Sequence, residues 1–126
     1  MKQTEIKVLD DKELEFIEAL RSLKVPRNVA ELITYLANAN EATSREIEMG
    51  TSLRQPEASI AMRTMRKNDW VDEREIKAEG KGRPMKVYKL NVPIEMIIQH
   101  YEEVKNSEVT KSMQAIQRLK EIAAAT

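Results

Sequence analysis

The chain has 126 residues, of which 41% are hydrophobic and 33% are charged, and its formal net charge is zero. This composition suits one compact globular domain with an appended element, and it excludes a disordered or fibrous chain. The absence of cysteine excludes disulfides, thiolate zinc sites, iron–sulfur clusters and cysteine nucleophiles.

The start of the chain is polar. Residues 1–11 contain no apolar run of the kind that a signal peptide needs, and no stretch approaches the roughly 18 apolar residues of a membrane span. We therefore expect a cytoplasmic protein without a membrane partner. The lack of cysteine is compatible with the reducing environment of the cytoplasm.

Two helices are predicted in the first third of the chain. From Asp11 to Leu23, apolar residues recur at three-residue steps among charged ones, which is typical of an amphipathic helix. These apolar residues are Leu14, Ile17, Leu20 and Leu23. Pro26 ends the pattern and suits the first turn of a second helix, which runs to Ala37.

A short helix is predicted next. Thr43 and Glu46 have the spacing of a capping box, in which each side chain binds the main-chain amide of the other residue. The helix should turn Ile47 inward and end at Gly50, because glycine tolerates the left-handed conformation that ends many helices.

A tight turn at 51–53 leads into a longer helix from Gln55 to Asn68. Pro56 lies in its first turn, where the missing N–H does no harm. The apolar side chains that share its predicted buried face are Ala58, Met62 and Met65.

The pattern then changes to extended segments. Residues 70–78 and 85–90 flank residues 79–84, which contain two glycines and a proline. This arrangement predicts a β-hairpin with a broad tip.

The last segment, from Pro93, carries two apolar stripes whose phase changes near residues 106–107, so it is either one bent helix or two consecutive helices. A terminal helix with a wide apolar face must bury that face, and we expect a second copy of the chain to cover it. The alternatives are that the face folds back on its own domain or that the N-terminal helix makes the dimer. The residues expected at this dimer interface are Ile94, Ile97, Ile98, Tyr101, Val109, Met113, Ile116 and Leu119.

The order of these elements predicts a winged helix-turn-helix, which is a mainly α fold with a small β-hairpin wing, followed by a C-terminal dimerisation helix. We divide the chain into an N-terminal tail (1–10), a DNA-binding domain (11–92) and a helical dimerisation segment (93–126).

This fold gives the helix from Gln55 the role of a recognition helix, because a major groove about 12 Å wide admits a helix. Arginine can form two hydrogen bonds with guanine, glutamine can do so with adenine, and an exposed Ile60 can touch a thymine methyl. The residues expected at the base edges are Arg54, Gln55, Pro56, Glu57, Ser59, Ile60 and Arg63.

The charge distribution favours the same interpretation. Residues 43–90 carry a net charge of +3, whereas the segments before and after carry −2 and −1. Local positive charge attracts phosphates, and acids more than about 10 Å away are largely screened. The expected wing contacts, to the flanking backbone or a minor groove, are Lys81, Arg83 and Lys86. The expected backbone contacts beside the recognition helix are Ser44, Arg45 and Lys67.

Several motifs together carry a family resemblance. They are residues 41–47 (EATSREI), residues 53–59 (LRQPEAS) with Met62 and Met65, Trp70-Val71, and residues 82–84 (GRP) with 87–90 (VYKL). With these motifs, the stretch from Leu23 to Leu90, about half the chain, resembles the winged-helix domains of the TrmB, MarR and ArsR families of transcriptional regulators. The resemblance implies a recognition helix beginning near Arg54, a wing at the GRP hairpin, and sequence-specific DNA binding as a homodimer on a roughly palindromic site.

The start of the recognition helix leaves two alternatives open. Arg54 is a poor N-cap, and Ser52 is the alternative, which would shift the helix start by a residue or two. Glu57 can accept a hydrogen bond from cytosine, but a carboxylate in the first turn also suits the helix dipole, and we favour the cap.

No metal or cofactor is predicted. Metal-sensing members of the resembled families use Cys and His ligands, whereas this chain has one histidine, His100, which we interpret as exposed rather than as a ligand beside Glu103. The adjacent carboxylate pairs have no His, Ser or Lys placed to complete a catalytic site, so we do not expect an enzyme. A small-molecule effector is compatible with the fold, but no residue pattern indicates one.

We therefore expect a transcriptional regulator that binds double-stranded DNA as a homodimer. One alternative is a winged-helix module for protein–protein interaction, which the zero net charge and the acidic N-terminal block favour. A second is an RNA-binding module, although the only candidates for base stacking are Trp70, Tyr88 and Tyr35.

Overall fold

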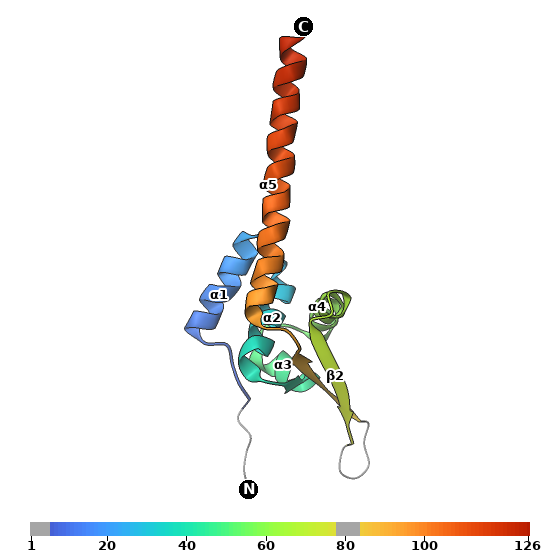
Figure 1. Ribbon diagram of the computed structural model, residues 1–126. Coiled ribbons are helices and arrows are strands. Elements are labelled where there is room, and N and C mark those ends of the chain that lie inside the picture. The colour runs from blue at the N-terminus through green and yellow to red at the C-terminus, as the bar shows by residue number, and fades with distance from the viewer. Residues whose placement is uncertain (1–5, 78–83) are drawn as a thin grey trace. The chain divides into compact units, whose positions relative to one another are not determined.

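The computed structural model of the chain describes residues 6–77 and 84–126, which fall into two units, Met1–Pro93 and Ile94–Thr126 (Figure 1). The predicted mainly helical class with a small sheet is confirmed. The elements of the first unit are α1 (Asp11–Ser22), α2 (Arg27–Ala39), β1 (Ala42–Thr43), α3 (Ser44–Gly50), α4 (Gln55–Lys67), β2 (Val71–Ile76) and β3 (Met85–Leu90). The second unit is α5 (Ile94–Ala124).

The three strands form one antiparallel sheet in the order β1-β3-β2. The predicted hairpin is confirmed by the pairing of β2 with β3, in which Val71 lies opposite Leu90 and Ile76 lies opposite Met85. Figure 1 shows these strands as a narrow ribbon. Strand β1 was not predicted, because two residues are too few to show an alternating pattern. The predicted turn at 79–84 lies almost wholly outside the described residues.

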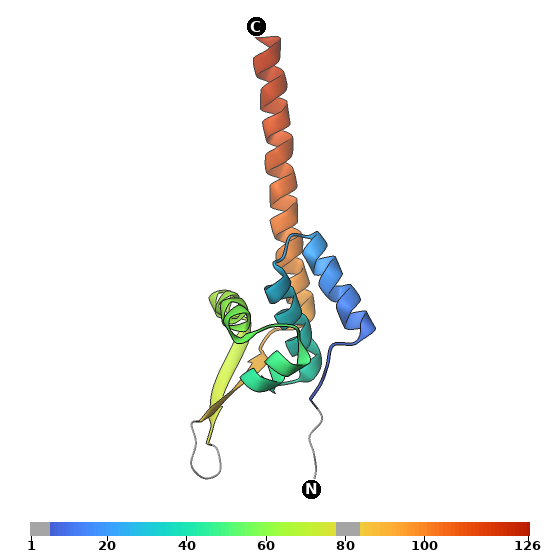
Figure 2. The ribbon, with the colours of Figure 1, turned by 180° about the vertical axis from the view of Figure 1, so that it is seen from behind.

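Helix α2 is the centre of the first unit and contacts α1, α3, α4 and β3 (Figure 2). Five of its eight buried residues are aliphatic, and the others are Glu31, Thr34 and Tyr35. Among the aliphatic ones are Val29, Leu32, Ile33 and Leu36. Burial of such a stripe contributes about 1.5–3 kcal/mol for each large side chain, so α2 is the main source of the unit's stability.

Helix α1 buries a narrower face than predicted. Ile17 and Leu20 are buried, but Leu14 is 48% exposed. A buried carboxylate, Glu13, takes part in the inward face, and its Oε1 accepts hydrogen bonds from Asp10 N (2.9 Å) and from Lys7 Nζ (3.1 Å). Glu13 and Asp10 thereby form a capping box at the start of α1.

The predicted capping box of α3 is confirmed. Thr43 Oγ1 accepts from Glu46 N at 3.1 Å, and Glu46 Oε1 accepts from Thr43 N at 2.9 Å. Ile47 is buried, also as predicted. The box satisfies two amides that the helix itself leaves without partners, so it defines where α3 begins.

Gly50 ends α3, but the predicted left-handed conformation is wrong. Its φ lies outside the left-handed region, and a Cβ at this position would collide with the main-chain oxygen of Lys7 and with the ring of Tyr35. Its own oxygen accepts a hydrogen bond from Leu9 N at 3.3 Å. Glycine is therefore needed because the N-terminal segment and α2 approach α3 closely.

The segment after Pro93 is a single helix of 31 residues, which decides between the two predicted alternatives. The described residues contain no helix that is long and apolar enough to cross a membrane.

The close approach at Gly50 gives a stability prediction. We expect Gly50→Ala to lower the free energy of unfolding by about 2 kcal/mol or more, because the added methyl group must displace main chain or the packed ring of Tyr35. Chemical denaturation measures this change. The control is Met49→Ala, which removes an exposed side chain from the same helix and should change stability by less than about 0.5 kcal/mol. Equal stabilities of the two variants would refute the packing role of Gly50.

Candidate nucleic-acid interface

Helix α4 lies across the unit with one side buried and the other open. Ala61, Met62 and Met65 are buried, Ala58 is half-buried, and Leu53 is buried just before the helix starts. The predicted buried face of Ala58, Met62 and Met65 thus lies inward, and Ala61 also belongs to it. Helix α4 contacts both α2 and α3, and these contacts fix which side chains point outward.

Six of the seven predicted base-contacting residues are exposed, and Glu57 is half-buried. Ile60 is 54% exposed. The other exposed residues of the predicted set are Arg54, Gln55, Pro56, Ser59 and Arg63, and Lys67 is exposed one turn further along. Residues 56, 60, 63 and 67 recur at helical spacing, so they form one face, which we call the α4 outer face.

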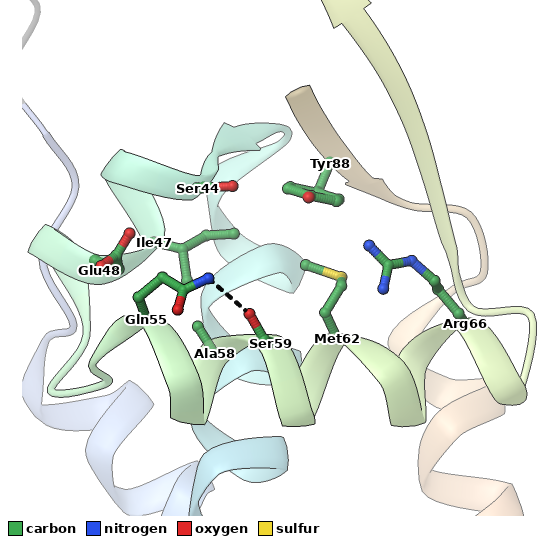
Figure 3. Close-up of a pocket in the computed structure, with 9 residues that line it drawn as sticks. All are labelled: Ser44, Ile47, Glu48, Gln55, Ala58, Ser59, Met62, Arg66 and Tyr88. Atoms are coloured by element: carbon green, nitrogen blue, oxygen red, sulfur yellow. Dashed lines mark hydrogen bonds between the residues drawn. The ribbon is translucent and has the colours of Figure 1, made fainter. Parts of the chain in front are cut away.

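A small cavity of about 80 Å³ lies between α3, α4 and β3 (Figure 3). Figure 3 shows Gln55, Ser59 and Met62 of α4 pointing toward it, with Tyr88 of β3 on the far side. Gln55 Nε2 donates to Ser59 Oγ at 3.0 Å. The volume is well below the roughly 300–1,000 Å³ of a small-molecule site, so this cavity is too small to hold such a ligand.

The arginines of the described residues separate into two groups. Arg21, Arg27, Arg66, Arg74 and Arg118 each form an ion pair with a glutamate. Among the described residues, Arg45, Arg54 and Arg63 form no ion pair, and all three are exposed. These three arginines all belong to the set predicted to contact DNA, and they lie at the start of α3, at the N-cap of α4 and on the α4 outer face. Arg83, the fourth arginine of that set, lies outside the described residues.

Arg66 lies on α4 as well, but its charge is neutralised by the hairpin. Its Nε donates to Glu73 Oε1 at 2.8 Å, and Lys86 Nζ lies 3.4 Å from Glu73 Oε2. The hydrogen bond from Arg66 lowers the pKa of Glu73, and the same bond raises the pKa of Arg66. Lys86, predicted as a wing contact, is exposed and shares this carboxylate. Lys81 and Arg83 lie outside the described residues.

The start of α4 is now defined. Arg54 is the N-cap, and its amide donates to Glu57 Oε1 at 3.2 Å. Glu57 Oε2 accepts from Arg27 Nη2 at 2.6 Å. Both carboxylate oxygens of Glu57 are thus engaged inside the protein, which favours capping over contact with cytosine. Ser52 does not cap α4, because its hydroxyl donates to Glu31 at 2.8 Å.

Glu31 is the positioning residue that the sequence did not reveal. It is only 5% exposed, and it accepts from Ser52 N (3.1 Å), from Ser52 Oγ (2.8 Å) and from Arg27 Nη1 (2.6 Å). Because Arg27 also holds Glu57, one network ties α2 to the turn before α4 and to the first turn of α4. The available clue was an acid within the apolar stripe of α2.

Among the described residues, no group of His, Cys, Asp and Glu is arranged to hold a metal ion.

The residues predicted for the dimer interface differ in exposure. Ile97 is fully buried, Ile94 and Tyr101 are half-buried, and Ile98, Val109, Met113, Ile116 and Leu119 are exposed.

A scan against protein-family models finds no match, and no curated protein sequence matches the chain. Among solved structures, the chain is similar to the crystal structure of the circadian clock associated protein Pex from anabaena, at 11% sequence identity and a TM-score of 0.46. The similarity covers 83% of this chain and 99% of that chain.

The Glu31 network predicts a large cost for one substitution. We expect Glu31→Ala to lower the free energy of unfolding by about 3 kcal/mol, because it leaves a cation and a main-chain amide without their buried partner. Urea unfolding measures this change. The matched control, Glu18→Ala, removes an exposed carboxylate paired with Arg21 and should cost less than about 0.5 kcal/mol. A small effect of Glu31→Ala would show that the network does not hold the turn.

Glu73 predicts a pH dependence. Its folded pKa is lowered, so its stabilisation is present above the unfolded pKa of about 4.3 and is lost as the pH falls through the folded pKa. We expect Glu73→Gln to lower the free energy of unfolding by at most about 1 kcal/mol at pH 7, with the difference from the parent shrinking toward pH 3. Urea unfolding at both pH values tests this, with Glu75→Gln, an exposed change on the same strand, as control. A difference that grows on acidification would contradict the assignment.

Proposed function

We propose that the protein is a winged helix-turn-helix transcriptional regulator, similar to the TrmB, MarR and ArsR families, that binds double-stranded DNA as a homodimer. The observation that carries the proposal is the separation of the arginines. Three exposed guanidinium groups have no carboxylate partner among the described residues, whereas the other described arginines of this unit are paired, and such groups are suited to phosphate and base edges.

In this proposal α3 and α4 are the helix-turn-helix, and α4 enters the major groove. Its 13 residues span about 20 Å. Arg54 and Gln55 lie at its N-terminal end, where bases are usually read, and Arg63 lies more than two turns further along. Ile60 provides an apolar contact of the kind that a thymine methyl group accepts. Glu57 has a structural role and reads no base.

Contacts to the DNA backbone come from both sides of α4. Arg45 and Ser44 are exposed at the first turn of α3, and Lys67 is exposed at the end of α4. The hairpin of β2 and β3 is the wing, and Lys86 lies opposite Glu75 in the second-to-last pair of residues before the tip. Lys81 and Arg83 belong to the wing in this proposal, where they would contact the flanking backbone or a minor groove.

The second candidate is a protein-interaction module. Met49 on α3 and Ile60 on α4 are both more than half exposed, and the chain has no net charge. Contacts with phosphates release counterions, so DNA binding falls steeply as salt is added. The salt dependence of binding therefore separates this candidate from DNA binding.

The test is binding of the full chain to labelled duplex DNA of random sequence by fluorescence anisotropy at 50 mM and 150 mM salt. We expect micromolar binding that weakens with salt. Arg54→Ala/Arg63→Ala should weaken binding about tenfold or more, and Lys81→Ala/Arg83→Ala should reduce the slope of log affinity against log salt.

Arg21→Ala is the matched control for the arginine substitutions, because Arg21 is on α1 and is already paired with Glu18. It should bind DNA as the parent does. If all variants bind equally, the α4 outer face is not the DNA surface. If the parent does not bind even at 50 mM salt, the protein-interaction module replaces the proposal.

A further inference from the structure

On helix α5, one stripe drawn in alternating steps of four and three residues carries large apolar side chains toward both ends of the helix, whereas its middle is charged or small. The residues of this stripe, which we call the α5 seam, are Ile94, Ile98, Tyr101, Lys105, Glu108, Ser112, Ala115, Leu119 and Ile122. A repeat of 3.5 residues per turn is the pattern of two helices that pack along their whole length.

Most of the α5 seam is open in the single chain. Every residue from 106 onward is exposed, and Leu119 is 66% and Ile122 is 49% exposed. Val109 and Ile116, which are exposed as well, flank the seam and widen its apolar surface. Because helices gain most of their stability from packing an apolar face, a helix of 31 residues needs a partner for this face.

The middle of the α5 seam decides the direction of the partner helix. Lys105 and Glu108 are the only charged residues of the seam, and they are one helical turn apart. In a parallel pair, Lys105 would face Lys105 of the other copy, and Glu108 would face Glu108. In an antiparallel pair centred between residues 106 and 107, each Lys105 faces a Glu108 and both charges are neutralised.

The same centre also matches side-chain sizes. It places Ile98 opposite Ala115 and Tyr101 opposite Ser112, so a large side chain faces a small one in these two layers. It places Ile94 opposite Leu119, and Ile122 has no seam residue opposite it. A shift of one heptad would instead place Lys105 opposite Ala115 and Glu108 opposite Ser112. Charge and volume therefore select one register.

We propose that two copies of the chain pair through α5 as an antiparallel coiled coil in which Lys105 of each copy faces Glu108 of the other. This inference describes how the homodimer of the proposed function is built. Only the role of that dimer in DNA binding rests on the proposed function. At a rise of about 1.5 Å per residue, the two Ile94 residues lie about 37 Å apart. The two DNA-binding units are thus attached to the coiled coil at a separation close to one turn of B-DNA, about 34–36 Å.

A charge swap tests the register. The dimer dissociation constant of the full chain is measured by sedimentation equilibrium without DNA. Lys105→Glu and Glu108→Lys should each raise it by about tenfold or more, because two like-charge contacts replace two ion pairs. The double variant Lys105→Glu/Glu108→Lys should restore the parent value.

The controls are Lys120→Glu and Glu103→Lys, which make the same charge changes away from the α5 seam on exposed residues of α5 and should leave the constant within about twofold. Circular dichroism shows whether each variant is folded. A monomeric parent, single swaps without effect, or a double variant as weak as the single ones would overturn the proposed register.

Cross-linking tests the direction independently, since the chain has no cysteine. Under oxidation, a mixture of Ile98→Cys and Ala115→Cys chains should form a disulfide-linked heterodimer, whereas neither variant alone should cross-link, because its two copies of the thiol lie about 25 Å apart. Self-cross-linking of each single variant would show a parallel pair and overturn the proposal. Neither test uses DNA, so failure of the α5 seam and failure of DNA binding are distinguishable.

Discussion

The orientation of α4 depends on one buried carboxylate. Glu31 of α2 accepts hydrogen bonds from the amide and the hydroxyl of Ser52 and from Arg27, and Arg27 also holds Glu57 in the first turn of α4. A buried carboxylate is costly unless its oxygens are satisfied, so the arrangement that satisfies Glu31 is strongly favoured over its alternatives. The contacts that set the α4 outer face are therefore made on the opposite side of the helix.

A chain with no net charge can leave some of its arginines without an acidic partner. The carboxylates of the first unit pair mainly with cations away from the α4 outer face: Glu18 with Arg21, Glu41 with Arg74, and Glu73 with Arg66 and Lys86. Each such pair cancels locally and contributes little to the field elsewhere. What the net charge conceals is the set of guanidinium groups that have no acidic partner among the described residues, Arg45, Arg54 and Arg63, and this is the set on which the proposed DNA binding rests.

The elements that the sequence predicted well are those with local causes. The capping box of Thr43 and Glu46 needs only a spacing of three residues, and the buried stripes of α2 and α4 need only a helical period. The features that were missed depend on residues distant in the chain. Strand β1 exists only because β3 pairs with it, Gly50 is required by Lys7 and Tyr35, and Glu31 acquires its role from Ser52.

The C-terminal helix shows the same limit for contacts between chains. If α5 packed only against its own chain, Lys105 and Glu108 would interrupt its apolar stripe. In the sequence this interruption looks like a change of phase near residues 106–107. The helix is nevertheless continuous from Ile94 to Ala124. On a stripe drawn in alternating steps of four and three residues, Lys105 and Glu108 are neighbouring positions with large apolar residues toward both ends. A polar pair at that place costs some apolar contact, but it disfavours every register in which the charges lack a partner, which is the usual role of polar residues in a coiled-coil seam.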